Sequence, residues 1–335
     1  MNKINFTSYR VLFDGQSSGF DASGGSIVCS EGEMTMLFQK ASDGAKGLRP
    51  LMTKSSDFGR SWTQPEPFGP DILKDPENEF MGLGLFGPSE KGTIFCVGVH
   101  LVKGITGNYR ESIKWRPGTA IIGRKEKGDI GFTYQYYPTG TFSGEQFAAP
   151  GIVLSDGRLL LTIWGAQNQY ENWSCGVLIS DDDGLTWKYS NVGNEQDLSI
   201  RNAADMPAGY NEQSLFETLE GDIVSLIRGR DKLGLVEDSP RDTWFLHSVS
   251  KDRGETWSHP VTSNIAGTGA SHRGITLPDG SLLHACRIPY HRTMYSLPEP
   301  DCYGLHLARS FDKGMTWSTE LLLQHDPDGS FEERA

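Results

Sequence analysis

Hydrophobic residues along the chain fall into short runs separated by turn residues, rather than into long helical stripes. Five times an apolar run, a glycine-containing turn and a second apolar run follow one another, as in GIVLSDGRLLLTIW at 151–164. Asp-Gly and similar turns between β-rich runs are typical of β-hairpins. The pattern therefore predicts five antiparallel hairpins, at residues 26–38, 83–99, 151–164, 214–227 and 274–286.

A recurring octet follows the hairpins after one further strand. Its form is S-x-D-x-G-x-[ST]-W at 55–62, 180–187, 250–257 and 310–317. A weaker copy, KGDIGFTY at 127–134, has a Lys and a Tyr in place of the Ser and the Trp. Runs such as CGVLIS lead into the octets, and the Trp opens a fourth strand. A repeat of about four short antiparallel strands is typical of a β-propeller blade.

The residue types of the octet favour a structural role. Its Asp can accept hydrogen bonds from the backbone of its own turn, and its Gly permits an unusual φ. Its Trp is suited to packing between blades. We therefore expect the octets to be structural turns rather than catalytic groups.

Composition and charge narrow the classes of partner. The chain has 335 residues, of which 37% are hydrophobic, so it can bury a large core. Its net charge of −12 argues against a nucleic-acid partner, which would require cationic side chains along a phosphate backbone. No apolar run approaches the roughly 20 residues of a membrane span, and the N-terminal MNKINFTSYR lacks an apolar leader core. We therefore expect a cytoplasmic protein without membrane contacts.

Cysteine and metal-ligand patterns are sparse. The five cysteines are scattered without a C-x-x-C pair, which favours reduced, buried thiols. No set of His, Asp and Glu has metal-ligand spacing, and no glycine-rich phosphate loop occurs. We therefore expect neither a metal nor a cofactor. The sequence leaves the oligomeric state open.

The octets resemble the Asp-boxes, or BNR repeats, of the sialidase-like propellers, and the resemblance covers nearly the whole chain. It implies an all-β fold, a β-propeller of four-stranded antiparallel blades within one domain over residues 1–335. Family members usually have six blades, and five full blades are visible here. We expect the chain to lack most of a sixth blade, of which YRVLFDG at 9–15 resembles the outermost strand. A five-bladed ring is the alternative.

The resemblance also implies catalytic residues on the inner strands, where polar side chains converge near the propeller axis. In blade four, YNEQSLFETLEGDIVSLIRGR places Glu212 and Arg228 where the sialidases have a Glu that activates a Tyr nucleophile and an Arg that binds the carboxylate of sialic acid. Asp43 lies at a matching distance for the family's acid/base residue. Two further family arginines are missing, because ASGGSIV at 22–28 and SLPEPDCYG at 296–304 contain none.

Other cationic residues can replace the missing arginines. Arg273 begins the inner strand of blade five beside His272, and Arg287 and Arg49 are further candidates for an anion-binding site. Each candidate also has a purely structural interpretation, such as a rim ion pair between Glu212 and Arg228, or an Asp43 that bonds its own turn. The sequence alone leaves both interpretations open.

These residues favour a carbohydrate-active enzyme, a glycoside hydrolase on an acidic or otherwise non-sialic glycan. Asp43 would be its acid/base, Glu212 its nucleophile or activator, and Arg228 with Arg273 its substrate clamp. One alternative is a polysaccharide lyase acting on a uronate, with His272 or a Tyr as base. A second alternative is a carbohydrate-binding or scaffold propeller without turnover.

Overall fold

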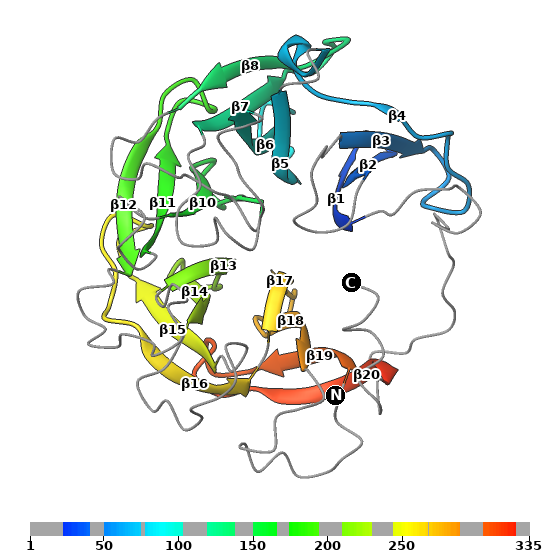
Figure 1. Cartoon of the computed structure of the whole chain (residues 1–335). Helices are drawn as coiled ribbons and strands as arrows, with labels where there is room; N and C mark the ends of the chain where they lie inside the picture. Colours follow the sequence, from blue (N-terminus) through cyan, green and yellow to red (C-terminus); the bar gives the residue numbers. More distant parts are fainter. Residues whose placement is uncertain are drawn as a thin grey trace. The chain divides into compact units, whose positions relative to one another are not determined.

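Strands make up almost all of the regular structure in the computed structural model of the chain (Figure 1). The structure describes residues 23–40, 50–74, 78–102, 119–137, 150–165, 174–193, 210–229, 244–266, 268–288 and 304–325. Within these ranges the strands form five four-stranded antiparallel sheets, and the single helical element is a short 3₁₀ turn, η1 (Asp71–Lys74). In this described part of the chain no helix is long and apolar enough to span a membrane.

Each sheet is a blade whose strands follow one another in chain order. Blade one contains β1 (Ser23–Ser30), β2 (Glu33–Gln39), β3 (Pro50–Ser55) and β4 (Glu66–Pro67). Blade two contains β5 (Asn78–Phe86), β6 (Ile94–Val102), β7 (Thr119–Lys125) and β8 (Thr133–Tyr136). Blade three contains β9 (Ile152–Val153), β10 (Leu159–Gly165), β11 (Ser174–Ser180) and β12 (Lys188–Gly193).

The two remaining blades have the same meander. Blade four contains β13 (Tyr210–Glu217), β14 (Ile223–Gly229), β15 (Trp244–Ser250) and β16 (Val261–Ala266). Blade five contains β17 (Thr268–Thr276), β18 (Leu282–Ile288), β19 (Gly304–Ser310) and β20 (Ser318–His325). The five hairpins predicted from the sequence are thereby confirmed.

The chain divides into two compact units, each with its own core. The first unit is Arg10–Glu171 with Val177–Tyr189, and it holds blades one and two together with β9 and β10. The second unit is Met1–Tyr9 with Asn172–Gly176 and Ser190–Ala335, and it holds blades four and five. The division passes through β11 and β12.

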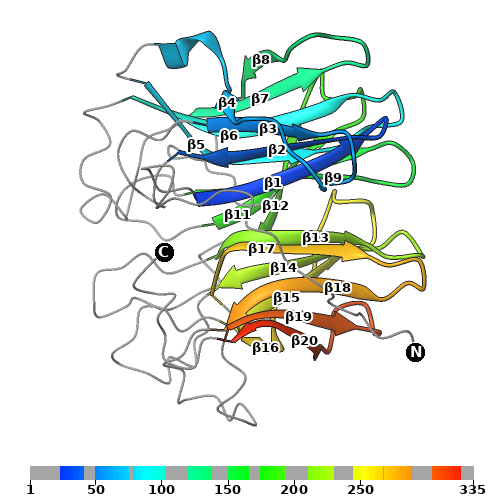
Figure 2. The same ribbon diagram turned by 90° about the vertical axis from the view of Figure 1, so that its right-hand side faces the viewer.

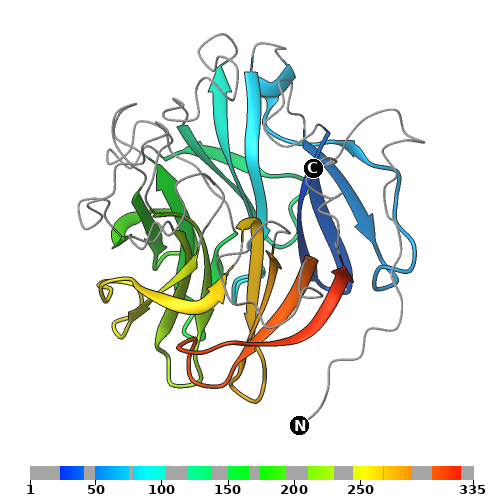
Figure 3. The same cartoon turned by 60° about the horizontal axis from the view of Figure 1, so that its bottom comes forward.

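Within each unit the blades pack face to face through apolar side chains. In the first unit β1 lies beside β5 (Figure 2). Phe95 and Leu161 belong to the buried cluster between blades two and three. In the second unit β13 lies beside β17 (Figure 3). The rings of Phe216 and Trp317 meet across the two blades. Successive four-stranded sheets joined in this way are propeller blades. The predicted β-propeller class is confirmed.

The octets form the turns between the third and fourth strands. In blade four the Asp252 carboxylate accepts hydrogen bonds from the Ser250 hydroxyl at 2.8 Å and from the Thr256 backbone N–H at 2.8 Å. The Gly254 N–H donates to Ser250 Oγ at 2.7 Å, and the Trp257 indole donates to the Gly254 carbonyl at 3.1 Å. The same bonds recur at residues 55–62, 180–187 and 310–317, so the structural interpretation of the octets is confirmed.

Two octets also pack against the preceding blade. A Cβ on Gly184 would approach Phe95 of blade two to 2.5 Å, and one on Gly314 would approach Val224 of blade four to 3.0 Å. The rings of Trp187 and Phe95 meet edge to face at 6.5 Å. These glycines are therefore required both for their positive φ and for close packing of the blades.

The weaker octet has a different backbone path. In the four full copies, the residue after the central Asp has positive φ, and so does the Gly that follows it. In the weaker copy the residue after the central Asp is Ile130, which is not in the left-handed region. Gly128, which precedes that Asp, has a φ of 93° instead. Lys127 has no hydroxyl to bond Asp129 and instead forms an exposed ion pair with Glu31 at 2.6 Å. The missing Ser therefore changes the turn.

Four of the five cysteines lie in the described residues, and all four carry free thiols. Cys96, Cys175 and Cys286 are buried, as predicted, and burial raises the pKa of the Cys286 thiol to about 12. The prediction is wrong for Cys29, which is exposed. Its position on β1, where alternate residues of the strand are exposed, accounts for the difference.

Candidate functional site

A β-bulge at the start of β13 places two candidate residues opposite each other. The register against β14 shifts before Gln213, which pairs with Ile227. In this gap β13 carries Asn211 and Glu212, whereas β14 carries only Arg228. Bulges of this two-against-one kind redirect side chains and are frequent beside functional sites.

The same irregularity recurs in other inner strands, so it belongs to the fold. In blade one residues 24–25 lie opposite Phe38, and in blade two residues 82–83 lie opposite Gly98. The shift in β17 of blade five is longer and ends at Arg273. In blade four, in contrast to blades one and two, the bulge brings a carboxylate and a guanidinium together.

Glu212 and Arg228 form a short ion pair. Arg228 Nη1 donates to Glu212 Oε2 at 2.7 Å, and the two side chains are 24% and 11% exposed. At this degree of burial the attraction is screened less than it would be in water. The structure therefore brings together the two blade-four residues singled out by the sequence, while their chemical roles stay predictions.

Arg273 adds a second positive charge to this pair. It follows the irregular start of β17 and forms the first regular pair, with Ala285 of β18. Burial lowers the pKa of its guanidinium to about 10, and the negative charge of Glu212 partly offsets this effect. Glu212 thus forms an ion pair with Arg228, and its negative charge also attracts Arg273 in a partly desolvated place.

His284 lies on β18, where it pairs with Gly274, the residue after Arg273, and its ring lies in the core between blades four and five. Its ring is fully buried, and the centroid distances to Phe245 and Trp317 are 5.2 and 5.7 Å. Burial lowers the pKa of the imidazole to about 3, although a hydrogen bond to the Arg273 backbone opposes that shift. The ring is therefore neutral at physiological pH, and it supports the strand that carries Arg273.

The structure does not describe the side chains of the other predicted site residues. Asp43 and Arg49 lie outside the described residues. His272 and Arg287 lie on β17 and β18, but the directions of their side chains are outside the described part. Their predicted roles therefore stay predictions.

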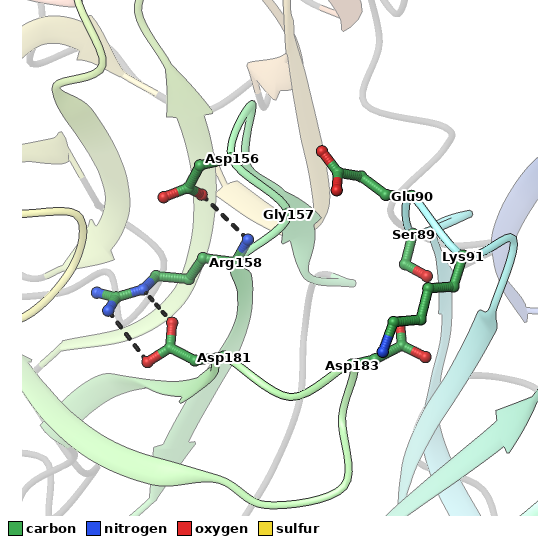
Figure 4. Close-up of a pocket in the computed structure, with 8 residues that line it drawn as sticks. All are labelled: Ser89, Glu90, Lys91, Asp156, Gly157, Arg158, Asp181 and Asp183. Carbon is green, nitrogen blue, oxygen red and sulfur yellow. Dashed lines mark hydrogen bonds and ion pairs between the residues drawn. The ribbon is translucent and has the colours of Figure 1, made fainter.

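Sequence reasoning missed a small polar pocket in the first unit (Figure 4). Its volume is about 170 Å³, and two hairpin turns and the blade-three octet contribute its walls. Arg158 faces Asp181 with Nε–Oδ1 2.7 Å, and the Asp183 carboxylate is held by Arg124 at 3.0 Å. Because its residues come from turns far apart in the chain, no local sequence signal marks it. The lining residues are Ser89, Glu90, Lys91, Asp156, Gly157, Arg158, Asp181 and Asp183.

Metal-ligating side chains do not gather in the described ranges. Among those residues no group of three or more His, Cys, Asp or Glu is placed to hold an ion.

Comparisons with known proteins agree with this architecture. The model of the BNR repeat-like domain matches residues 140–332. A sialidase from Clostridium perfringens is 23% identical over 180 residues, which cover 50% of this chain and 42% of the sialidase. The chain thus spans less than half the length of that curated relative.

Solved structures extend the likeness over most of the chain. A protein of unknown function from Dyadobacter fermentans has a TM-score of 0.67 at 20% identity, with 92% of this chain and 85% of that protein covered. The Hadza microbial sialidase Hz136 has a TM-score of 0.68 at 14% identity, with 91% of this chain and 59% of the sialidase covered. At these identities the likeness establishes a common fold.

Proposed function

The chain belongs to the BNR repeat-like domain family, and from this premise we propose that it is a glycoside hydrolase acting on an acidic or otherwise non-sialic glycan. The observation that supports this proposal is the ion pair of Glu212 on β13 with Arg228 on β14, together with the attraction of Glu212 for Arg273 on β17. Propeller ligands are expected where inner-strand side chains converge.

In this proposal Arg228 and Arg273 bind the carboxylate of an acidic sugar. Guanidinium groups suit this task because their planar donors match the two oxygens of a carboxylate. Arg273 carries its charge at a partly desolvated position, so a second anion beside it is favourable. This requirement for an anionic group is the reason for proposing an acidic glycan.

Glu212 acts in this proposal as the nucleophile or as the group that activates one. A carboxylate in contact with Arg228 stays ionised near neutral pH, as either role requires. Asp43 is proposed as the acid that protonates the leaving oxygen. Propeller sialidases that use a Tyr nucleophile are known exceptions to the two-carboxylate scheme of glycosidases, so a Tyr partner for Glu212 remains part of the proposal.

Sialic acid is not the proposed substrate. Neither residues 22–28 nor residues 296–304, which correspond to two of the three arginines of the sialidases, contain an Arg. Arg273 lies on a different strand segment from both, so it would hold a carboxylate in a different place. The resemblance to sialidases therefore supports the fold and the class of reaction, whereas it gives little support for sialic acid as the substrate.

A lyase acting on a uronate is the second candidate, and Arg273 is the observation that favours it. Proton abstraction beside a carboxylate is easier when a cation neutralises that carboxylate. His272 or a Tyr would then serve as the base. A binding propeller without turnover would use the same cluster to hold an acidic sugar.

The test is turnover of a panel of aryl glycosides and acidic oligosaccharides, an aryl sialoside included, by the wild type and by Glu212→Gln. Release of aryl alcohol or free sugar from one substrate, abolished by the substitution, supports the hydrolase. An unsaturated uronate product would instead identify the lyase. Binding of an acidic sugar without any product would contradict both and leave the binding propeller.

A further inference from the structure

The residue that closes the blade-four bulge is a buried amide. Gln213 is 1% exposed and forms the first regular pair of β13 after the bulge, directly after Glu212. Its Nε2 donates to the Gly176 carbonyl of β11 at 2.5 Å, and its Oε1 accepts from the Ser225 hydroxyl of β14 at 2.8 Å. Both ends of the amide are therefore fixed, one to β14 of the same blade and one to β11 of blade three.

Blade one has a counterpart at the same position. Ser26 closes the bulge of β1, is 6% exposed, and exchanges two hydrogen bonds with the backbone of Leu85 in β5, at 3.0 and 2.7 Å. A buried polar side chain thus anchors the end of the bulge in both blades. The blade-one bulge consists of two glycines, whereas the blade-four bulge carries Glu212.

We propose that Gln213 is a positioning residue, which fixes the bulge of β13 and so holds Glu212 against Arg228. A bulge has an unpaired residue and can relax if its ends are free. Because Gln213 is tied to two separate strands, the backbone beside Glu212 has little freedom. The significance for catalysis rests on the proposed function, but the effect on the ion pair does not.

Gln213→Leu tests the proposal, since leucine has similar bulk but neither polar group. The first readout is the NMR signal of the Arg228 guanidinium, because we expect its bridged Nη1 protons to be protected from exchange in the wild type. We expect this protection to be lost in a variant that remains folded by circular dichroism. The second readout is kinetic: kcat should fall on the order of 100-fold, with a smaller change in KM, because a small displacement of a reacting group is costly.

Two further substitutions separate positioning from general stability. Ser26→Ala removes the equivalent anchor in blade one, and it should lower Tm without changing the Arg228 signal. Ser225→Ala breaks one of the two bonds of Gln213, and it should weaken the signal partly, whereas Ser225→Thr keeps the hydroxyl and should preserve it. These milder variants decide the question if Gln213→Leu does not fold.

An unchanged Arg228 signal in folded Gln213→Leu, or an equal loss in Ser26→Ala, would overturn the proposal. If the wild type turns over no sugar, the proposed function fails, while the NMR comparison still decides the role of Gln213. The two failures are therefore distinguishable.

Discussion

At the scale of single residues, the chemistry of the candidate site depends on the charges that face one another there. Glu212 neutralises Arg228 directly, at 2.7 Å, and also lies close enough to act on Arg273. The pairing of Glu212 with Arg228 could be predicted from the sequence, because both lie on one hairpin. The approach of Arg273 could not be derived from spacing, because it depends on how blade five packs on blade four.

His284 should make the protein less stable in mild acid. Its pKa is about 3 in the folded state, compared with an ordinary value of 6.5, so between these pH values only the unfolded chain binds the proton. Stability is therefore fully present above about pH 6.5 and declines as the pH falls, by at most about 1.4 kcal/mol per pH unit. Burial lowers the pKa of His247 as well, which adds to the same trend.

The measurement is urea unfolding of the wild type and of His284→Leu between about pH 6.5 and 5, above the range in which carboxylates titrate. We expect the slope of unfolding free energy against pH to decrease in the variant, which has no buried imidazole. Equal slopes would contradict the assignment of the acid sensitivity to His284.

At the scale of elements, local features were predictable and register was not. The bonds of an octet connect residues at most four positions apart, as from Asp252 to Thr256, so their sequence determines their structure. The bulges depend on one extra residue against a partner strand, which leaves no mark in the hydrophobic pattern. For this reason β5 begins at Asn78, before the hairpin predicted to start at residue 83. In the same way β17 begins at Thr268, before the start predicted at Arg273.

Removing an octet carboxylate should destabilise the protein. Asp252→Ala leaves the Thr256 N–H and the Ser250 hydroxyl without their acceptor, at an expected cost of about 1–3 kcal/mol. Lys251→Ala changes an exposed neighbour in the same turn and should stay within about 0.5 kcal/mol of the wild type. Denaturant unfolding of both variants checks this prediction, and equal stabilities would refute the structural role of the octet.

A methyl group between blades four and five should be costly. A Cβ on Gly274 would clash with the Phe216 ring, which is 1% exposed and cannot move freely. We expect Gly274→Ala to lose about 1–3 kcal/mol of unfolding free energy. Gly131→Ala is the control, because a Cβ there meets nothing within 4 Å.

The same measurement in a double variant identifies the cause. Phe216→Leu provides space for the new methyl group, so Gly274→Ala should cost less in that background than in the wild type. Additive losses would show that the close approach of Gly274 to Phe216 is not the source of the destabilisation.

At the scale of the whole molecule, the fold followed from repetition and the function did not. Repeated hairpins and octets predict blades because each repeat forms one sheet and buries its faces against its neighbours. The overall charge of −12 does not indicate the proposed anion site, because that site depends on the local placement of Arg228 and Arg273. Substrate choice depends on such local groups, which a shared fold leaves free to vary.

The central claim is that Arg228 and Arg273 bind an acidic sugar beside Glu212, and calorimetric titration with glucuronic acid tests it most directly. Glu212→Gln should bind several-fold more tightly than the wild type, because the ligand no longer competes with a built-in carboxylate. Arg273→Gln should bind about tenfold or more weakly, since a charge-assisted contact is lost. Equal affinities in all three proteins, or weaker binding by Glu212→Gln, would contradict the account.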